Sequence, residues 1–307
     1  MISILLVKKL FELFLIMIMG FTLVKLKVLN SKDSKSISII SLYLITPCVI
    51  INAFQVQYTV EKRNGLLLAF LAAIIIHIIL LSLTKVFHKF LKLDEVERGS
   101  IIYSNSGNLI IPLVASILGP EWVIYSSAFV SVQLVIMWTH GKMLLSSENK
   151  INIRNITTNI NFISVIVGMI FFVNQVRLPE VIRDTLGSVG GTIGPISMII
   201  TGMLIGNVNL KKLLSYKKIY IVAFLKMIFY PLVALVFLKF GGLNSLVPEG
   251  KTILLITLLA TITPSASTIT QMSQIYGRDA EYASIINVIT TLICIITMPL
   301  IVLIYQL

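Results

Sequence analysis

Long apolar runs separated by short polar segments extend along the whole chain. Ten of them approach the roughly 20 residues that an α-helix needs to cross the hydrocarbon core of a bilayer. They lie near residues 2–24, 37–57, 66–87, 99–118, 122–145, 159–176, 186–207, 218–239, 252–273 and 282–305. Backbone polar groups in lipid must form hydrogen bonds within their own segment, so each run predicts a transmembrane helix. The pattern therefore predicts an all-α membrane protein with ten spans.

Glycine and proline positions repeat between the two halves of the chain. Gly20 lies 27 residues before Pro47, and Gly168 lies 27 residues before Pro195. Helices broken at corresponding places in two halves are typical of secondary transporters with inverted repeats, so we expect breaks at Pro47 and Pro195. Each half has five predicted spans, so the second half would insert upside down relative to the first. The predicted units are a first repeat at 1–145, a cytoplasmic linker at 146–158 and a second repeat at 159–307.

Each half also contains one apolar run that a proline and small polar residues interrupt. We expect these two breaks at Pro112, in the fourth run, and at Pro264, in the ninth. A proline kink patched by Ser and Thr side chains explains either cluster taken singly. Their corresponding positions in the two halves favour a binding site instead. The candidate substrate-binding residues are Asn105, Ser106, Gly107, Asn108, Pro112, Pro264, Ser265, Ser267, Thr268 and Gln271.

The electrostatics of these breaks favour an anionic substrate. A helix that restarts inside the membrane presents unpaired N–H groups with a partial positive charge, and these attract anions. The fourth, fifth, ninth and tenth runs contain no Asp or Glu apart from Glu121 and Glu281 at their ends. A cation exchanger would be expected to keep buried carboxylates there. The sequence therefore favours a small anionic or neutral organic substrate, bound by hydrogen bonds from the polar clusters.

Two further residues are candidates for charge compensation or coupling. Lys226 lies about 12 Å into the eighth run, counted from Lys218 at about 1.5 Å per residue. A charge at that depth marks a functional site, unless the side chain extends back to the headgroups. His77, in the third run, either relays a proton or is a packed, hydrogen-bonded core histidine. The sequence leaves both pairs of alternatives open.

The net charge of +12 reflects membrane topology rather than nucleic-acid binding. Sixteen basic residues lie in the loops after the odd-numbered spans, and six lie in the other loops. The positive-inside rule then places the odd-numbered loops in the cytoplasm and both termini outside the plasma membrane. Both cysteines, Cys48 and Cys294, lie inside apolar runs, which argues against a disulfide framework. The sequence also has no metal-ligand cluster, phosphate loop or nucleophile–base set, so we expect no cofactor and no enzymatic activity.

The seventh run contains the small-residue pair Gly202 and Gly206. Small residues at this spacing let two helices approach closely. The pair therefore indicates either a homodimer face or tight packing within one protomer.

Several short segments, taken together and in their order along the chain, resemble the auxin efflux carrier family. This family includes plant auxin exporters and bacterial malate and malonate permeases. The resemblance covers nearly the whole chain. The matching segments are LITPCVI at 44–50, NSGNLIIP at 105–112, PISM at 195–198 running into Gly202 and Gly206, PSA at 264–266, YGRD at 276–279 and MPL at 298–300.

The resemblance implies a fold of the bile-acid symporter and sodium/proton antiporter type, with ten helices in two inverted five-helix repeats. Spans 1, 2, 6 and 7 would form a scaffold that often dimerises, and the other six a mobile core with crossed broken helices 4 and 9. The carboxylate-binding asparagine of the family corresponds to Asn105. Two departures stand out: Thr268 replaces a common asparagine, and Asn161 is followed by Phe162 instead of proline.

The function expected on these grounds is a secondary carrier, a permease or efflux carrier, for small organic anions such as mono- or dicarboxylates. It would alternate access around breaks at Pro112 and Pro264. Two alternatives remain. One is a sodium-coupled symporter of another organic solute on the same fold. The other is a membrane sensor that binds a ligand without transporting it.

Overall fold

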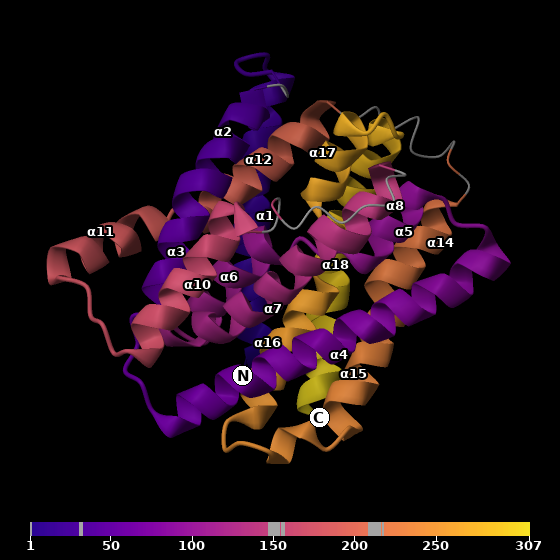
Figure 1. Ribbon diagram of the computed structural model, residues 1–307. Helices are drawn as coiled ribbons and strands as arrows, with labels where there is room; N and C mark the ends of the chain where they lie inside the picture. The colour runs from indigo at the N-terminus through magenta and orange to yellow at the C-terminus, as the bar shows by residue number, and fades with distance from the viewer. Residues whose placement is uncertain (1, 31–32, 147–153, 155–156, 208–215, 217) are drawn as a thin grey trace.

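The computed structural model describes residues 2–30, 33–146, 154, 157–207, 216 and 218–307, and it is a bundle of helices without strands in those residues (Figure 1). Each predicted apolar run coincides with one helix or with two or more consecutive helical segments. The start of the first helix and the end of the last lie at the same end of the bundle (Figure 1). Of the predicted linker at 146–158, residues 147–153, 155 and 156 are outside the described part of the chain.

The helices are labelled α, and short π- or 3₁₀-helical segments are labelled η. In the first half they are α1 (Ile2–Lys25), α2 (Ser34–Ile40), η2 (Ser41–Ile45), α3 (Thr46–Ala53), α4 (Val60–Leu91), α5 (Glu95–Ile102), α6 (Ser106–Ile117), η3 (Pro120–Trp122), α7 (Val123–Ile136), η4 (Met137–Gly141) and α8 (Lys142–Ser146). In the second half they are α10 (Ile160–Val173), α11 (Glu180–Gly190), α12 (Ile193–Asn207), α14 (Ile219–Phe224), η5 (Leu225–Phe229), α15 (Tyr230–Phe240), η6 (Leu243–Ser245), α16 (Gly250–Ile262), α17 (Ser267–Ile275) and α18 (Ala280–Gln306).

Six helical segments in the described residues are long and apolar enough to cross a membrane. They are Ser34–Ala53, Val60–Leu91, Pro120–Ser146, Glu180–Gly206, Ile219–Phe240 and Ala280–Gln306. The fourth, sixth and ninth runs instead contain shorter apolar helices, α6, α10 and α16. Helix α1 is long but carries Lys8, Lys9 and Glu12 in its first half. The structure is therefore that of a multi-pass membrane protein.

Polar residues at the helix starts fix several of these boundaries. The Asp94 side chain accepts a hydrogen bond from the Glu97 N–H, and the Glu97 side chain accepts one from the Asp94 N–H, which forms a capping box at the start of α5. Thr59 and Asn159 cap α4 and α10 with their side-chain oxygens. Asp279 does the same for α18. These caps satisfy N–H groups that the first turn of a helix leaves without partners.

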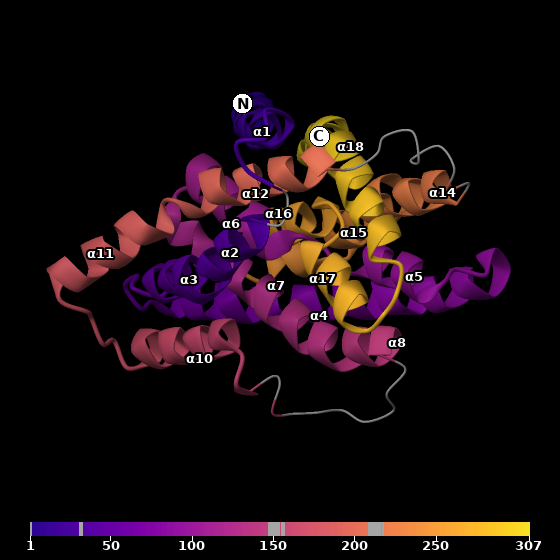
Figure 2. The same ribbon diagram turned by 90° about the horizontal axis from the view of Figure 1, so that it is seen from above.

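Contacts between helices divide the bundle into two groups. In the first, α1 packs on α12, and α3 packs on α10 and α11. In the second, α4 packs on α7 and α16, α6 on α7, α15 on α16, and α18 on α16 and α17. Figure 2 shows α3, α10 and α11 on one side of the molecule and α5, α14 and α15 on the other. The two groups meet where α6 and α18 contact α1 and α12, and where α7 contacts α3 and α10.

Glycines make the contact between α1 and α12 unusually close. A Cβ atom on Gly202 would overlap the backbone of Met17, and one on Gly20 would overlap the backbone of Ile199. A Cβ atom on Gly206 would overlap the side chain of Val24. Of the two sequence-based alternatives for Gly202 and Gly206, the structure therefore supports tight packing within one protomer.

The predicted breaks at Pro47 and Pro195 are only partly found. Pro47 follows the π-helical segment η2 and starts α3 without a gap, so the helix is distorted there but continuous. The prediction of a break at Pro47 was wrong because the π-helical turn just before Pro47 accommodates the proline as a local distortion of a continuous helix. Pro195 lies just after a real interruption at Gly191 and Thr192, between α11 and α12.

Candidate functional site

The two broken helices meet at their breaks. Ser104, between α5 and α6, forms an antiparallel bridge with Ser265, between α16 and α17. The Asn105 N–H donates to the Pro264 carbonyl at 2.8 Å, and the Ala266 N–H donates to the Tyr103 carbonyl at 3.0 Å. Each extended segment thus supplies hydrogen-bond partners to the other, which lets backbone without helical bonds exist inside a bundle of apolar helices.

The first break is not where the sequence predicted it. Pro112 lies inside α6, and the non-helical residues are Tyr103, Ser104 and Asn105. Pro264 does lie in the second break, where it forces Thr263 into an extended conformation with a ψ of 153° and so ends α16. The prediction of a break at Pro112 was wrong because α6 accommodates this proline within its continuous helix.

A glutamine on α7 stabilises the first break. The Gln133 side chain accepts from the Ser104 N–H at 2.9 Å and donates to the Ser104 carbonyl at 2.8 Å. Its Nε2 also donates to Ser106 Oγ at 3.0 Å. One buried side-chain amide therefore replaces the two backbone partners that Ser104 would have in a regular element.

At the second break, two residues on α18 form hydrogen bonds with the backbone N–H and carbonyl of Ser265. Asn287 Nδ2 donates to the Ser265 carbonyl, and the Ser265 N–H donates to Thr290 Oγ1 at 3.1 Å. The sequence analysis missed Gln133, Asn287 and Thr290. The available signal was the single side-chain amide in each run, Gln133 in the fifth and Asn287 in the tenth.

Lys226 contacts the first break directly. Its side chain is only 1% exposed, and Nζ donates to Ser104 Oγ at 2.6 Å. Ser104 Oγ in turn donates to the Thr261 carbonyl, in the last turn of α16, at 3.2 Å. No carboxylate of the described residues lies within 4.0 Å of this ammonium. The structure therefore excludes a lysine that extends back to the headgroups, and it places Lys226 at the crossing, on the π-helical segment η5.

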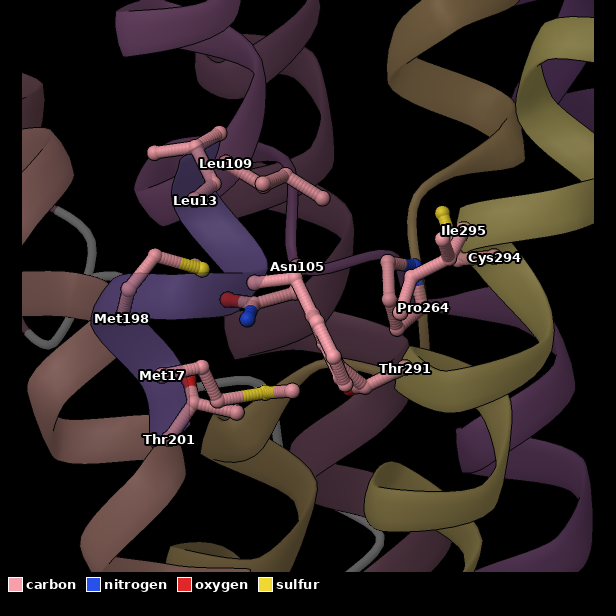
Figure 3. Close-up of a pocket in the computed structure, with 11 residues that line it drawn as sticks. Leu13, Met17, Asn105, Leu109, Met198, Thr201, Pro264, Thr291, Cys294 and Ile295 are labelled. Atoms are coloured by element: carbon pink, nitrogen blue, oxygen red, sulfur yellow. The ribbon is translucent and has the colours of Figure 1, made fainter. Parts of the chain in front are cut away.

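A small cavity of about 30 Å³ lies beside the crossing (Figure 3). Residues of both breaks and of helices α1, α6, α12 and α18 line it: Leu13, Phe14, Met17, Asn105, Leu109, Met198, Thr201, Pro264, Thr291, Cys294 and Ile295. Figure 3 shows the amide of Asn105 pointing toward Met198, on the α12 side of the cavity. None of these lining residues is charged, so Asn105 is the strongest polar group that faces the space.

The first turns of α6 and α17 begin at this crossing. Within the described residues, the backbone N–H groups of Ser106, Gly107, Asn108, Ser267 and Thr268 donate no hydrogen bond. Such N–H groups give a helix N-terminus its partial positive charge and its affinity for anions. Neither helix has a side-chain cap, and the Asn108 amide instead donates to Asn105 Oδ1 at 3.2 Å.

A much larger cleft of about 910 Å³ separates the two groups of helices on one side of the crossing. Pro112 lines it together with residues of α1, α3 and α11. Leu13 lines both the cleft and the small cavity, so the two spaces adjoin at this side chain. The charged residues of the cleft are Glu12, Glu121, Arg183 and Asp184.

The remaining predicted site residues fall into different places. Ser106 and Ser265 are buried at the breaks, where they stabilise the crossing rather than line a cavity. Gln271 is exposed on α17 and lines neither space, because Ile269 and Met272 occupy the buried face of that helix. His77 is buried on α4, where Nδ1 lies 2.7 Å from the Ala73 carbonyl oxygen and the ring lies 4.8 Å from that of Phe129.

A bundle of membrane-length apolar helices, with two of them broken and joined at their breaks, is typical of a membrane transporter. The sequence profile of a family described as "Membrane transport protein" matches residues 5–160 and 149–302. The chain therefore belongs to the auxin efflux carrier family of membrane transport proteins. No curated protein matches the chain.

Proposed function

We propose that this protein is a secondary carrier of small organic anions, with mono- and dicarboxylates as its substrate class. Its ten spans would form two inverted five-helix repeats. The scaffold would comprise α1, α2–α3, α10 and α11–α12, and the remaining helices would form a core that moves against it. The division of helix contacts into two groups supports this arrangement.

The observation that carries the proposal is the position of Asn105. Its amide faces the small cavity, next to two helix N-termini whose first-turn N–H groups have no partner among the described residues. A carboxylate placed there would accept hydrogen bonds from backbone N–H groups and from the amide. The lining has no charged side chain, so a substrate cation would have no counter-charge in the cavity, whereas an anion would meet partial positive charge.

Access to this site would alternate around the crossing. The large cleft ends at Leu13, beside the cavity, and provides the approach from one side of the membrane. A shift of the core along α1 and α12 would close this approach and open the opposite one. The contact surfaces of α1 and α12 contain Leu13, Met17 and Met198, and such flexible apolar side chains can slide without breaking hydrogen bonds.

Flux measurement with purified protein tests the function. Proteoliposomes should take up labelled lactate or malate, and should exclude choline and glucose. A thermal-shift series of mono- and dicarboxylates should give the same order of preference as the flux. Binding without flux would identify a sensor instead, and transport of the neutral or cationic solutes alone would contradict the proposed substrate class.

A further inference from the structure

The crossing has two electrically opposite sides. The N-termini of α6 and α17 form its positive side, and the C-terminal ends of α5 and α16 form its negative side. In carriers built on broken helices, the carbonyl groups at such C-terminal ends hold the coupling cation, while the N-terminal ends face the anionic group of the substrate.

Side chains of the protein already occupy the negative side. Thr263 Oγ1 donates to the Ala260 carbonyl at 2.8 Å, and Cys294 Sγ donates to the Ile262 carbonyl at 3.8 Å. The Thr261 carbonyl accepts from Ser104 Oγ, which itself accepts from Lys226 Nζ. A hydrogen-bonded chain thus connects the ammonium to the last turn of α16.

The charge of Lys226 has no other compensation in the described residues. Its side chain is buried, and no carboxylate lies within 4.0 Å of Nζ. A buried ammonium without a carboxylate is unfavourable unless carbonyl dipoles or a bound anion stabilise it. The C-terminal carbonyls supply the first of these, and an anion on the opposite side of the crossing would supply the second.

We infer that the ammonium of Lys226 is a tethered coupling cation, an inference that rests on the proposed function. It occupies the place of the sodium ion in cation-coupled carriers of this construction, so anion transport requires no sodium. Sodium at this position would be repelled by the ammonium. The core carries one fixed positive charge, which a bound monocarboxylate neutralises.

This arrangement predicts where transport responds to membrane potential. With a monocarboxylate bound, the core moves without net charge, and the empty core returns with one positive charge. Exchange of lactate for lactate should therefore be insensitive to an imposed potential, whereas net lactate uptake should respond to it. With an uncharged residue at position 226, net uptake would still move one negative charge per cycle, but the loaded core would carry that charge, so lactate exchange would also respond to the potential.

Ion replacement in proteoliposomes tests the inference. Wild-type uptake of labelled lactate or malate should be equal in sodium and in N-methylglucamine media. Lys226→Ser leaves space and a hydroxyl group at the negative side, so its uptake should fall at least tenfold without sodium and recover with sodium or ethylammonium. Lys226→Met fills the space and should not recover. Lys239→Met, a change to a lysine that lies at the end of α15 and bonds the Ile304 carbonyl, is the control and should retain wild-type flux.

The outcomes separate this inference from the proposed function. Anion uptake by the wild type that requires sodium overturns the tethered cation and leaves the anion carrier intact. Wild-type rates in sodium-free medium for Lys226→Ser overturn it as well, and so does a folded Lys226→Ser protein that neither sodium nor ethylammonium restores. If the wild type moves neither lactate nor malate, the proposed function fails and the inference fails with it. Should Lys226→Ser not fold, the sodium dependence of the wild type decides.

Discussion

Gln133 and Asn287 have equivalent roles at the two breaks of the crossing. The side-chain amide N–H of each donates a hydrogen bond to the carbonyl of the serine in a non-helical break, Ser104 for Gln133 and Ser265 for Asn287. Gln133 projects from α7, which follows the first break, and Asn287 from α18, which follows the second. Each break is therefore held by the next long helix in its own half of the chain. The pair links the repeat seen in the sequence to a function in the folded protein.

Replacement of Gln133 by leucine should destabilise the protein and stop transport. The substitution removes the partners of the Ser104 N–H and carbonyl, and each buried unsatisfied group costs about 1–3 kcal/mol. The thermal unfolding temperature in detergent should fall, and flux should be lost. Gln271→Leu is the matched control, because Gln271 is exposed on α17. A Gln133→Leu protein as stable as the control would contradict the role of this amide.

Asn105→Ala should abolish or strongly weaken transport and leave folding intact. Hydrogen bonds to charged groups are worth roughly 1.5–3 kcal/mol, which corresponds to about tenfold to a hundredfold in affinity. Substrate-induced thermal shifts and flux measure the two effects separately. Asn174→Ala, at the exposed end of α10, is the control substitution. Wild-type affinity in Asn105→Ala would move the substrate site away from the small cavity.

Gly202→Ala should impair folding through the contact between α1 and α12. The added methyl group would overlap the backbone of Met17, and overpacking of this kind costs typically about 1–3 kcal/mol. Expression level and thermal stability in detergent report the effect. At Gly191 an added Cβ would come no closer than 3.4 Å to its neighbours, so Gly191→Ala should be tolerated. Equal stability of the two variants would show that the helices can separate without loss.

Single cysteines should report the orientation in the membrane. In a background without Cys48 and Cys294, a cysteine at Asn64 should react with an impermeant maleimide in intact cells. A cysteine at Ser215, which lies outside the described residues, should react only after permeabilisation. The opposite pattern would place both termini in the cytoplasm and contradict the predicted orientation.

The sequence predicted those features that depend on local pattern. Apolar runs gave the helices, and polar residues in the fourth and ninth runs gave Asn105 and Pro264, because such residues are unfavourable in lipid unless they serve a site. The depth of Lys226 marked it as a candidate, although its contact with Ser104 depends on residues 122 positions apart.

Features that depend on three-dimensional pairing could not be predicted in this way. The position of the first break at Ser104 depends on Gln133, 29 residues further along the chain. The exposure of Gln271 depends on which face of α17 packs against its neighbours. Proline positions alone are a poor guide, since Pro264 ends a helix whereas Pro112 lies within one.

The size of the cavity beside Asn105 has a consequence for how affinity is measured. A space of about 30 Å³ holds two or so water molecules and excludes even a small dicarboxylate. A substrate therefore binds only to a conformer with a wider cavity. The apparent dissociation constant is then the intrinsic constant divided by the fraction of molecules in that wider conformer. Substitutions far from the crossing that favour the wider conformer should tighten binding without a new contact. Weak binding to the purified protein would thus reflect the large fraction of molecules with the narrow cavity as much as a weak intrinsic affinity of the site.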